Sequence, residues 1–90
     1  MITLDLADLP TAGQLQSETD ERRGVIANRL LLHVLDDCNQ ATKRGRFSIP
    51  FHCGMPEYQP CDQEMEGEIL EALFKLGFKR LDGIYITWRD

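Results

Sequence analysis

The stretch CDQEMEGEILEALFKLGFKRLDGIYITW, residues 61–88, decides the fold of this chain. Its first half carries apolar side chains at helical spacing, namely Ile69, Leu70, Leu73 and Leu76, and Gly77 ends that run. Two short β-prone segments, 78–81 and 84–88, then flank Asp82-Gly83, a dipeptide typical of tight hairpins. The stretch therefore predicts a helix followed directly by a two-stranded hairpin, against which the rest of the chain packs.

The residues just before this unit predict a loop and a strand. In 46–52, Phe47, Ile49 and Phe51 alternate with polar residues, as in a strand with one buried face. Pro50 has no N–H for a ladder, which favours a sheet edge. Residues 53–60 contain one Gly and two Pro and predict a loop, after which Asp62 is expected to cap the next helix.

A long first helix is predicted ahead of the strand. Ser17 followed by acids resembles a capping box, and Lys43, Arg44 and Gly45 supply stop signals. Between them an apolar stripe recurs every three or four residues: Ala27, Leu30, Leu31, Val34, Cys38 and Ala41. Leu32 and Leu35 widen this face, so the helix is either deeply packed in the core or offers a self-association or partner surface.

Residues 1–16 are treated as a separate segment, and 17–90 as a single α+β domain. Ile2, Leu4 and Leu6 alternate with other residues as in a short edge strand, and Pro10 and Gly13 break regular structure. A free arm that docks on another protein fits the same pattern, and both interpretations stay open.

The predicted fold is a two-layer α+β sandwich in the order α-β-α-β-β. We expect a three-stranded mixed sheet with the C-terminal strand in its centre, because 84–88 is the most apolar and β-prone segment. Both helices would cover one face of that sheet. Six side chains would lie beneath them: Phe47, Ile49, Phe51, Ile84, Ile86 and Trp88.

Composition excludes several classes of function. Ninety residues with 42% hydrophobic and 28% charged side chains suit one soluble domain, and no apolar run is long enough to span a bilayer. The odd number of cysteines, with no paired spacing, favours reduced thiols in a cytoplasmic protein. The net charge of −5, and an acidic run from Glu57 to Glu71 without Lys or Arg, argue against binding to nucleic acid.

Metal binding and catalysis find little support in the sequence. His52, Cys53 and Cys61, with His33 or Cys38, could supply zinc ligands, but the cysteine spacing differs from that of structural zinc sites. Isolated thiols without a chemical role are favoured. No nucleophile, base and orienting group can be assigned. We therefore predict no enzyme activity, no cofactor and no metal site.

Two features suggest a surface for a protein partner. Glu64, Glu68 and Glu71 share one face of the predicted helix, which is either merely solvated or meets basic residues of a partner. The loop carries the large side chains Met55 and Tyr58, which either contact a partner or fold back against the sheet edge. The predicted partner-binding residues are Met55, Glu57, Tyr58, Glu64, Glu68 and Glu71.

The order of several structural motifs resembles the layout of small accessory proteins of tailed bacteriophages. The matching motifs are Lys43-Arg44-Gly45, Phe47-Ile49-Phe51, Leu76-Gly77-Phe78 and Ile84-Tyr85-Ile86-Thr87-Trp88, within about residues 25 to 88. The resemblance implies a phage or prophage origin and a location in the bacterial host cytoplasm. It supplies no shared activity and no catalytic residues.

These observations lead to two functional hypotheses. The first is a small acidic interaction module, a phage-encoded modulator or inhibitor of a host protein that acts by surface binding without catalysis. The second is a structural or assembly component that forms a homodimer or larger homo-oligomer through the N-terminal arm and the long helix.

Overall fold

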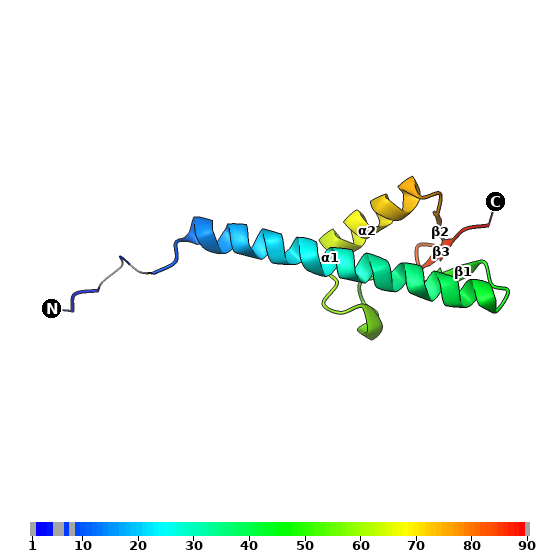
Figure 1. The fold of residues 1–90 in the computed structure, drawn as a ribbon, viewed down its shortest axis with the longest axis horizontal. Coiled ribbons are helices and arrows are strands. Elements are labelled where there is room, and N and C mark those ends of the chain that lie inside the picture. The colour runs from blue at the N-terminus through cyan, green and yellow to red at the C-terminus, as the bar shows by residue number, and fades with distance from the viewer. Residues whose placement is uncertain (1, 5–6, 8, 90) are drawn as a thin grey trace.

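The computed structural model describes residues 2–4, 7 and 9–89. Their helices and strands follow in the order α1 (Ala12–Lys43), β1 (Ser48–Pro50), η1 (Pro56–Tyr58, a 3₁₀ turn), α2 (Gln63–Lys75), β2 (Lys79–Leu81) and β3 (Tyr85–Thr87). The predicted α+β class is confirmed. The molecule measures 69 × 24 × 22 Å, and α1 runs along its long axis with its N-terminal part, about residues 12–22, projecting beyond the other elements (Figure 1).

Helix α1 begins earlier than the sequence predicted. Thr11 is the N-cap: its hydroxyl accepts a hydrogen bond from the Gln14 N–H at 3.1 Å, and the Gln14 side chain accepts one from the Thr11 N–H at 2.8 Å. The prediction that Ser17 opens the helix is therefore wrong, because a Thr–Gln capping box lies six residues upstream of it. At the other end, Gly45 has a φ of 75° just beyond the C-cap, which confirms the predicted stop.

The edge strand predicted as one alternative for the first residues falls only partly within the described chain. Residues 2–4 have neither helical nor strand structure. Leu6, on which the alternating pattern also depends, lies outside the described residues, as do Met1, Asp5 and Asp8. Residues 12–16 belong to α1.

The sheet has the strand order β1-β3-β2, so the C-terminal strand is central as predicted. Both neighbouring pairs are antiparallel, with Ile49 opposite Ile86 and Arg80 opposite Ile86. The prediction of a mixed sheet is wrong: β1 and β2 run in the same direction, but each pairs only with β3. At the hairpin tip Asp82 and Gly83 have φ of 55° and 71°, the left-handed values that a type I′ turn requires.

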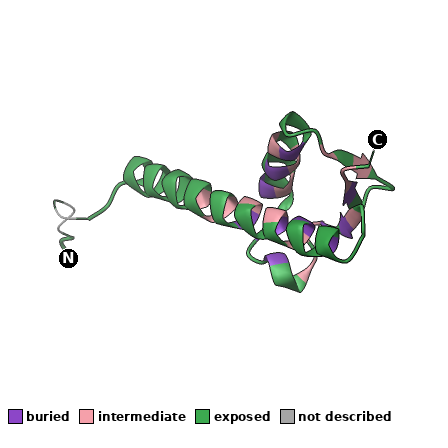
Figure 2. Ribbon diagram, turned by 45° about the vertical axis from the view of Figure 1, so that its right-hand side comes forward, coloured by how far each residue is buried: buried purple, intermediate pink, exposed green. Residues whose placement is uncertain are grey.

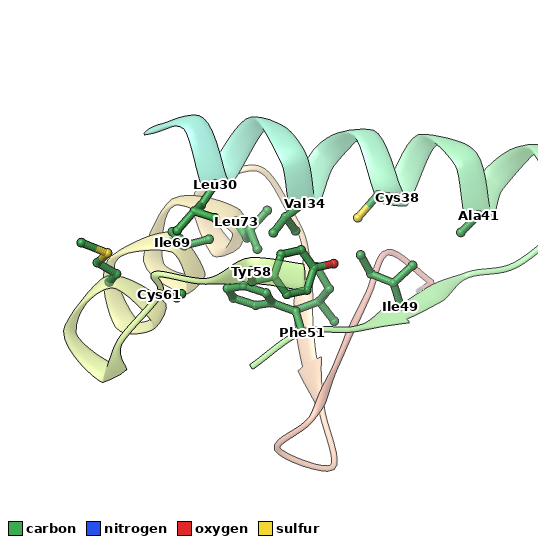
Figure 3. Packing of buried hydrophobic residues seen from close by; sticks show 12 residues of the cluster. Leu30, Val34, Cys38, Ala41, Ile49, Phe51, Tyr58, Cys61, Ile69 and Leu73 are labelled. Carbon is green, nitrogen blue, oxygen red and sulfur yellow. The ribbon is translucent and has the colours of Figure 1, made fainter. Parts of the chain in front are cut away.

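One hydrophobic cluster joins both helices to the sheet and the loop (Figure 3). Val34, Phe51, Leu73 and Ile86 are completely buried in it. Of the six side chains predicted to lie beneath the helices, Ile49, Phe51 and Ile86 are buried and Trp88 is partly buried. Phe47 and Ile84 are 51% and 46% exposed, so for them the prediction is wrong.

Phe47 and Ile84 lie at opposite ends of the β1–β3 ladder, outside the hydrophobic cluster. Each strand spans three residues, and both of these side chains lie just outside that paired segment. The Phe47 ring instead packs beneath the Arg89 guanidinium, whose carbon is 5.0 Å from the ring centroid. Ile84 belongs to the hairpin turn, which projects away from the helices (Figure 3). No helix within the described residues is both long and apolar enough to cross a membrane.

Candidate protein-binding surface

An ion pair fixes the start of α2 against α1. Asp62 is the N-cap of α2 and accepts a hydrogen bond from the Met65 N–H at 2.9 Å. The Arg23 guanidinium of α1 bonds both Asp62 carboxylate oxygens, at 2.8 and 3.0 Å. The Met65 N–H and then the guanidinium lower the pKa of Asp62 below its usual value. The two helices are therefore joined at this end, and in Figure 2 they diverge towards the C-terminus of α2.

A groove composed of two separate hollows follows the flank of α1 that faces α2. Its narrow part, about 180 Å³, is lined by Gly24, Ala27, Asn28 and Leu31 of α1 and by Glu68, Ile69 and Ala72 of α2. Its wide part, about 410 Å³, is lined by Leu35, Cys38, Asn39 and Thr42 of α1 and by Leu76, Gly77, Phe78 and Trp88. The α1 residues of both parts recur every three or four positions, so they lie on one side of the helix. We call the two parts together the α1–α2 groove.

The floor of this groove is apolar, and small residues keep it open. Gly24 and Ala27 leave space where larger side chains would fill the narrow part. In the wide part, the rings of Phe78 and Trp88 pack edge to face with centroids 6.0 Å apart. Leu31 and Leu35 are partly buried against the core on the α1 side. An apolar side chain of a partner would therefore meet carbon atoms on both walls.

One carboxylate, that of Glu68, lines the groove on the α2 side, and two further acids share its face of the helix. Glu64, Glu68 and Glu71 lie on one face of α2 and are exposed, as predicted for that helix face. The Arg23 Nη2 atom lies 3.5 Å from Glu64 Oε2, and the Lys75 Nζ atom lies 3.9 Å from Glu71 Oε1. Among the described residues no ion pair involves Glu68, which itself lines the narrow part. The rim is thus acidic but partly neutralised at its two ends.

The loop residues predicted to bind a partner lie elsewhere. Tyr58 is only 1% exposed; its ring packs edge to face on Phe51, and its hydroxyl donates to Asp37 at 2.7 Å. Burial, and then this hydrogen bond, raise the pKa of Tyr58. Its ring is therefore unavailable to a partner in this conformation. Met55 is partly buried and Glu57 is exposed.

The six predicted partner-binding residues do not form one surface. The η1 turn, which includes Glu57, and α2, which carries Glu64, Glu68 and Glu71, lie on opposite sides of α1 (Figure 1). The predicted set therefore divides into an α2 rim and a loop. Sequence reasoning missed the groove itself, although Gly24, Ala27 and Leu31 recur at helical spacing and could have marked that flank.

All three cysteines are free, and two of them, Cys38 and Cys61, are buried. Burial raises the pKa of both Cys38 and Cys61 to about 11, and the pKa of Cys53 is also raised, again chiefly by desolvation. Within the described residues the one group of three metal-binding side chains is His33, Asp37 and Glu57, and it includes none of the cysteines.

Fold and surface together define a small α+β domain with two helices, a three-stranded antiparallel sheet and an acid-rimmed groove. A comparison with protein-family models, curated proteins and solved structures found no match to this chain.

Proposed function

We propose that this chain is a protein–protein interaction module that binds a polypeptide segment in the α1–α2 groove and catalyses no reaction. One observation carries the proposal: a mainly apolar groove follows the flank of α1 that faces α2, and the exposed carboxylate of Glu68 lines its narrow part. Grooves of this kind accept the apolar face of an amphipathic helix, whose charged side chains then meet the rim.

The chemistry of the groove indicates what the partner must offer. Apolar side chains would occupy the wide part between Leu35 and Trp88, where binding buries carbon against carbon. Lys or Arg side chains one or two turns away would approach Glu68 and the neighbouring acids. The net charge of −5 would also speed encounter with a basic partner.

The loop is left out of this surface, because Tyr58 is buried and η1 lies on the other side of α1. The resemblance of the motif order to phage accessory proteins is the reason for proposing a protein of the bacterial host as the partner. Binding in the groove would then modulate or inhibit that host protein by occupying its basic segment.

Charge reversal on α2 tests the proposal. We would immobilise the purified chain, capture proteins from host lysate and compare wild type with the triple variant Glu64→Lys, Glu68→Lys, Glu71→Lys. The matched control carries the same charge change on the projecting part of α1, namely Glu18→Lys, Asp20→Lys, Glu21→Lys, where all three residues are exposed. Circular dichroism first establishes that both variants are folded.

The proposal predicts that a protein captured by wild type is retained by the control and lost by the α2 variant. Equal capture by all three proteins would show that the carboxylates of α2 do not contribute to binding. Loss in both variants would show that net charge alone governs capture, which contradicts a defined groove.

The second candidate, a homo-oligomeric assembly component, rests on the projecting part of α1. All residues from 12 to 22 are exposed, and Leu15 is 50% exposed on this segment. An isolated helix gains little stability without packing, so contact between two copies would stabilise this part. Light scattering after size exclusion tests it: a dimer that Leu15→Ser dissociates supports assembly, and a strict monomer at high concentration contradicts it.

A further inference from the structure

The flank of α1 opposite the groove carries a second set of side chains that the proposed function does not use. His33 and Asp37 lie one turn apart on α1, and Glu57 approaches them from η1. One ligand atom from each of the three residues lies within 4.8 Å of the other two. We propose that His33, Asp37 and Glu57 form a binding site for a divalent transition-metal ion of the zinc type.

The spacing of the donors fits such an ion with little movement. The His33 Nε2 atom is 3.6 Å from Asp37 Oδ2. Zinc bonds to nitrogen and oxygen are about 2.0–2.2 Å long, so two ligand atoms at tetrahedral angles are about 3.3–3.6 Å apart. The helical pair already has this separation. Glu57 is exposed, so its side chain can rotate towards the His33–Asp37 pair.

Tyr58 holds the two helical ligands in place from behind. Its hydroxyl donates to Asp37 Oδ2 at 2.7 Å, and its ring meets the His33 ring edge to face at a centroid distance of 5.2 Å. Tyr58 is itself fixed in the core beneath α1 (Figure 3). Hydrogen bonds of this type to a ligating carboxylate orient it and strengthen metal binding. Because Tyr58 is fixed in the core, its sequence neighbour Glu57 is held close to the site.

The charge and type of the donors indicate the class of ion. Two carboxylates beside a histidine create a local negative charge that a divalent cation would neutralise. Arg44 and Arg46 line the adjoining depression of about 280 Å³ with Asp37 and Glu57, but within the described residues neither forms an ion pair with them. An imidazole ligand suits zinc and similar metals, whereas Ca²⁺ and Mg²⁺ prefer oxygen alone.

Zinc titration by calorimetry tests the site. The untagged full chain, freed of metal with a chelator and kept reduced, would be titrated with ZnCl₂ and, separately, with MgCl₂. We expect about one equivalent of zinc to bind, with Glu57→Gln and His33→Gln each weakening binding at least about tenfold. Glu57→Gln is the more informative of the two variants. The Glu57 side chain is exposed, and the described residues show no contact through which it stabilises the fold.

Two controls separate this site from zinc binding elsewhere on the surface. Glu64→Gln removes an exposed carboxylate from α2, and Cys53→Ser removes the most accessible thiol; both should bind zinc as wild type does. The proposal is overturned if wild type binds no zinc or binds magnesium as tightly, or if affinity survives either Glu57→Gln or His33→Gln. Loss of binding in Cys53→Ser would also overturn it, because the ligand would then be a thiolate.

Discussion

Replacing Arg80 with Met should destabilise the domain strongly, because one guanidinium joins three parts of the fold. The Arg80 guanidinium donates to the Phe51 carbonyl at 2.6 Å and to the Gly83 carbonyl, and it pairs with Glu66 Oε1 at 3.2 Å. Strand β2 is thereby tied to the end of β1, to the hairpin tip and to α2. The side chains of Arg80 and Glu66 are only 20% and 18% exposed, so water replaces these bonds poorly.

The expected loss follows from these contacts. Breaking a buried ion pair by removing one partner costs about 3–5 kcal/mol. Because both side chains keep some contact with water, we expect roughly 3 kcal/mol for Arg80→Met, the low end of that range. Lys79→Met, an exchange at the exposed neighbouring position, should change stability by less than about 0.5 kcal/mol.

Urea unfolding followed by circular dichroism measures these differences. The double variant Arg80→Met, Glu66→Gln should be more stable than the sum of the single variants predicts, by about 1 kcal/mol or more, because it leaves no unpaired carboxylate. A loss below about 1 kcal/mol for Arg80→Met, or additive single variants, would refute the role of this ion pair in joining the three elements.

Three further predictions concern the helix ends and the thiols. Thr11→Ala should reduce the helicity measured by circular dichroism and speed amide exchange in the first turn of α1, whereas Ser17→Ala should leave both unchanged. The opposite pattern would show that the helix begins at Ser17 instead. Asp62 has a lowered pKa in the folded state, so its contribution to stability is complete above its usual pKa of 3.8 and disappears as the pH falls through the lowered value. The variant Asp62→Ala should therefore lose stability at neutral pH and show a flatter acid limb in unfolding titrations, and an acid limb as steep as that of wild type would contradict this. Of the three thiols only Cys53 should react with a disulfide reagent at neutral pH, and slowly; rapid reaction of a second thiol in the folded protein would contradict the burial of the other two.

Local sequence signals predicted the elements of this fold well. The periodicity of Leu70 and Leu73, the stop at Gly45 and the Asp82-Gly83 turn depend on neighbouring residues alone, and each matches the structure. The start of α1 was missed because Gly13 and Pro10 are residues that normally break regular structure. Pro10 precedes the cap, where it interrupts no helical hydrogen bond, and a glycine in the first turn is tolerated.

The candidate surface was harder to predict because it depends on the packing of distant segments. Tyr58 is a loop residue with no local signal for burial, yet Phe51, His33 and Asp37 enclose it. The groove arises from the divergence of two helices that are pinned at one end by Arg23. Neither that angle nor the proximity of Glu57 to α1 can be derived from spacing along the chain.

Site-specific crosslinking tests the proposed groove most directly. A photoreactive side chain would replace Asn28, at the rim of the groove, or Gln40, an exposed residue that lines the depression on the other flank of α1. Each protein would be irradiated with the captured partner. The groove proposal predicts an adduct between the partner and position 28, and none with position 40. An adduct at position 40 alone, or an adduct only between two copies of this chain, would contradict it.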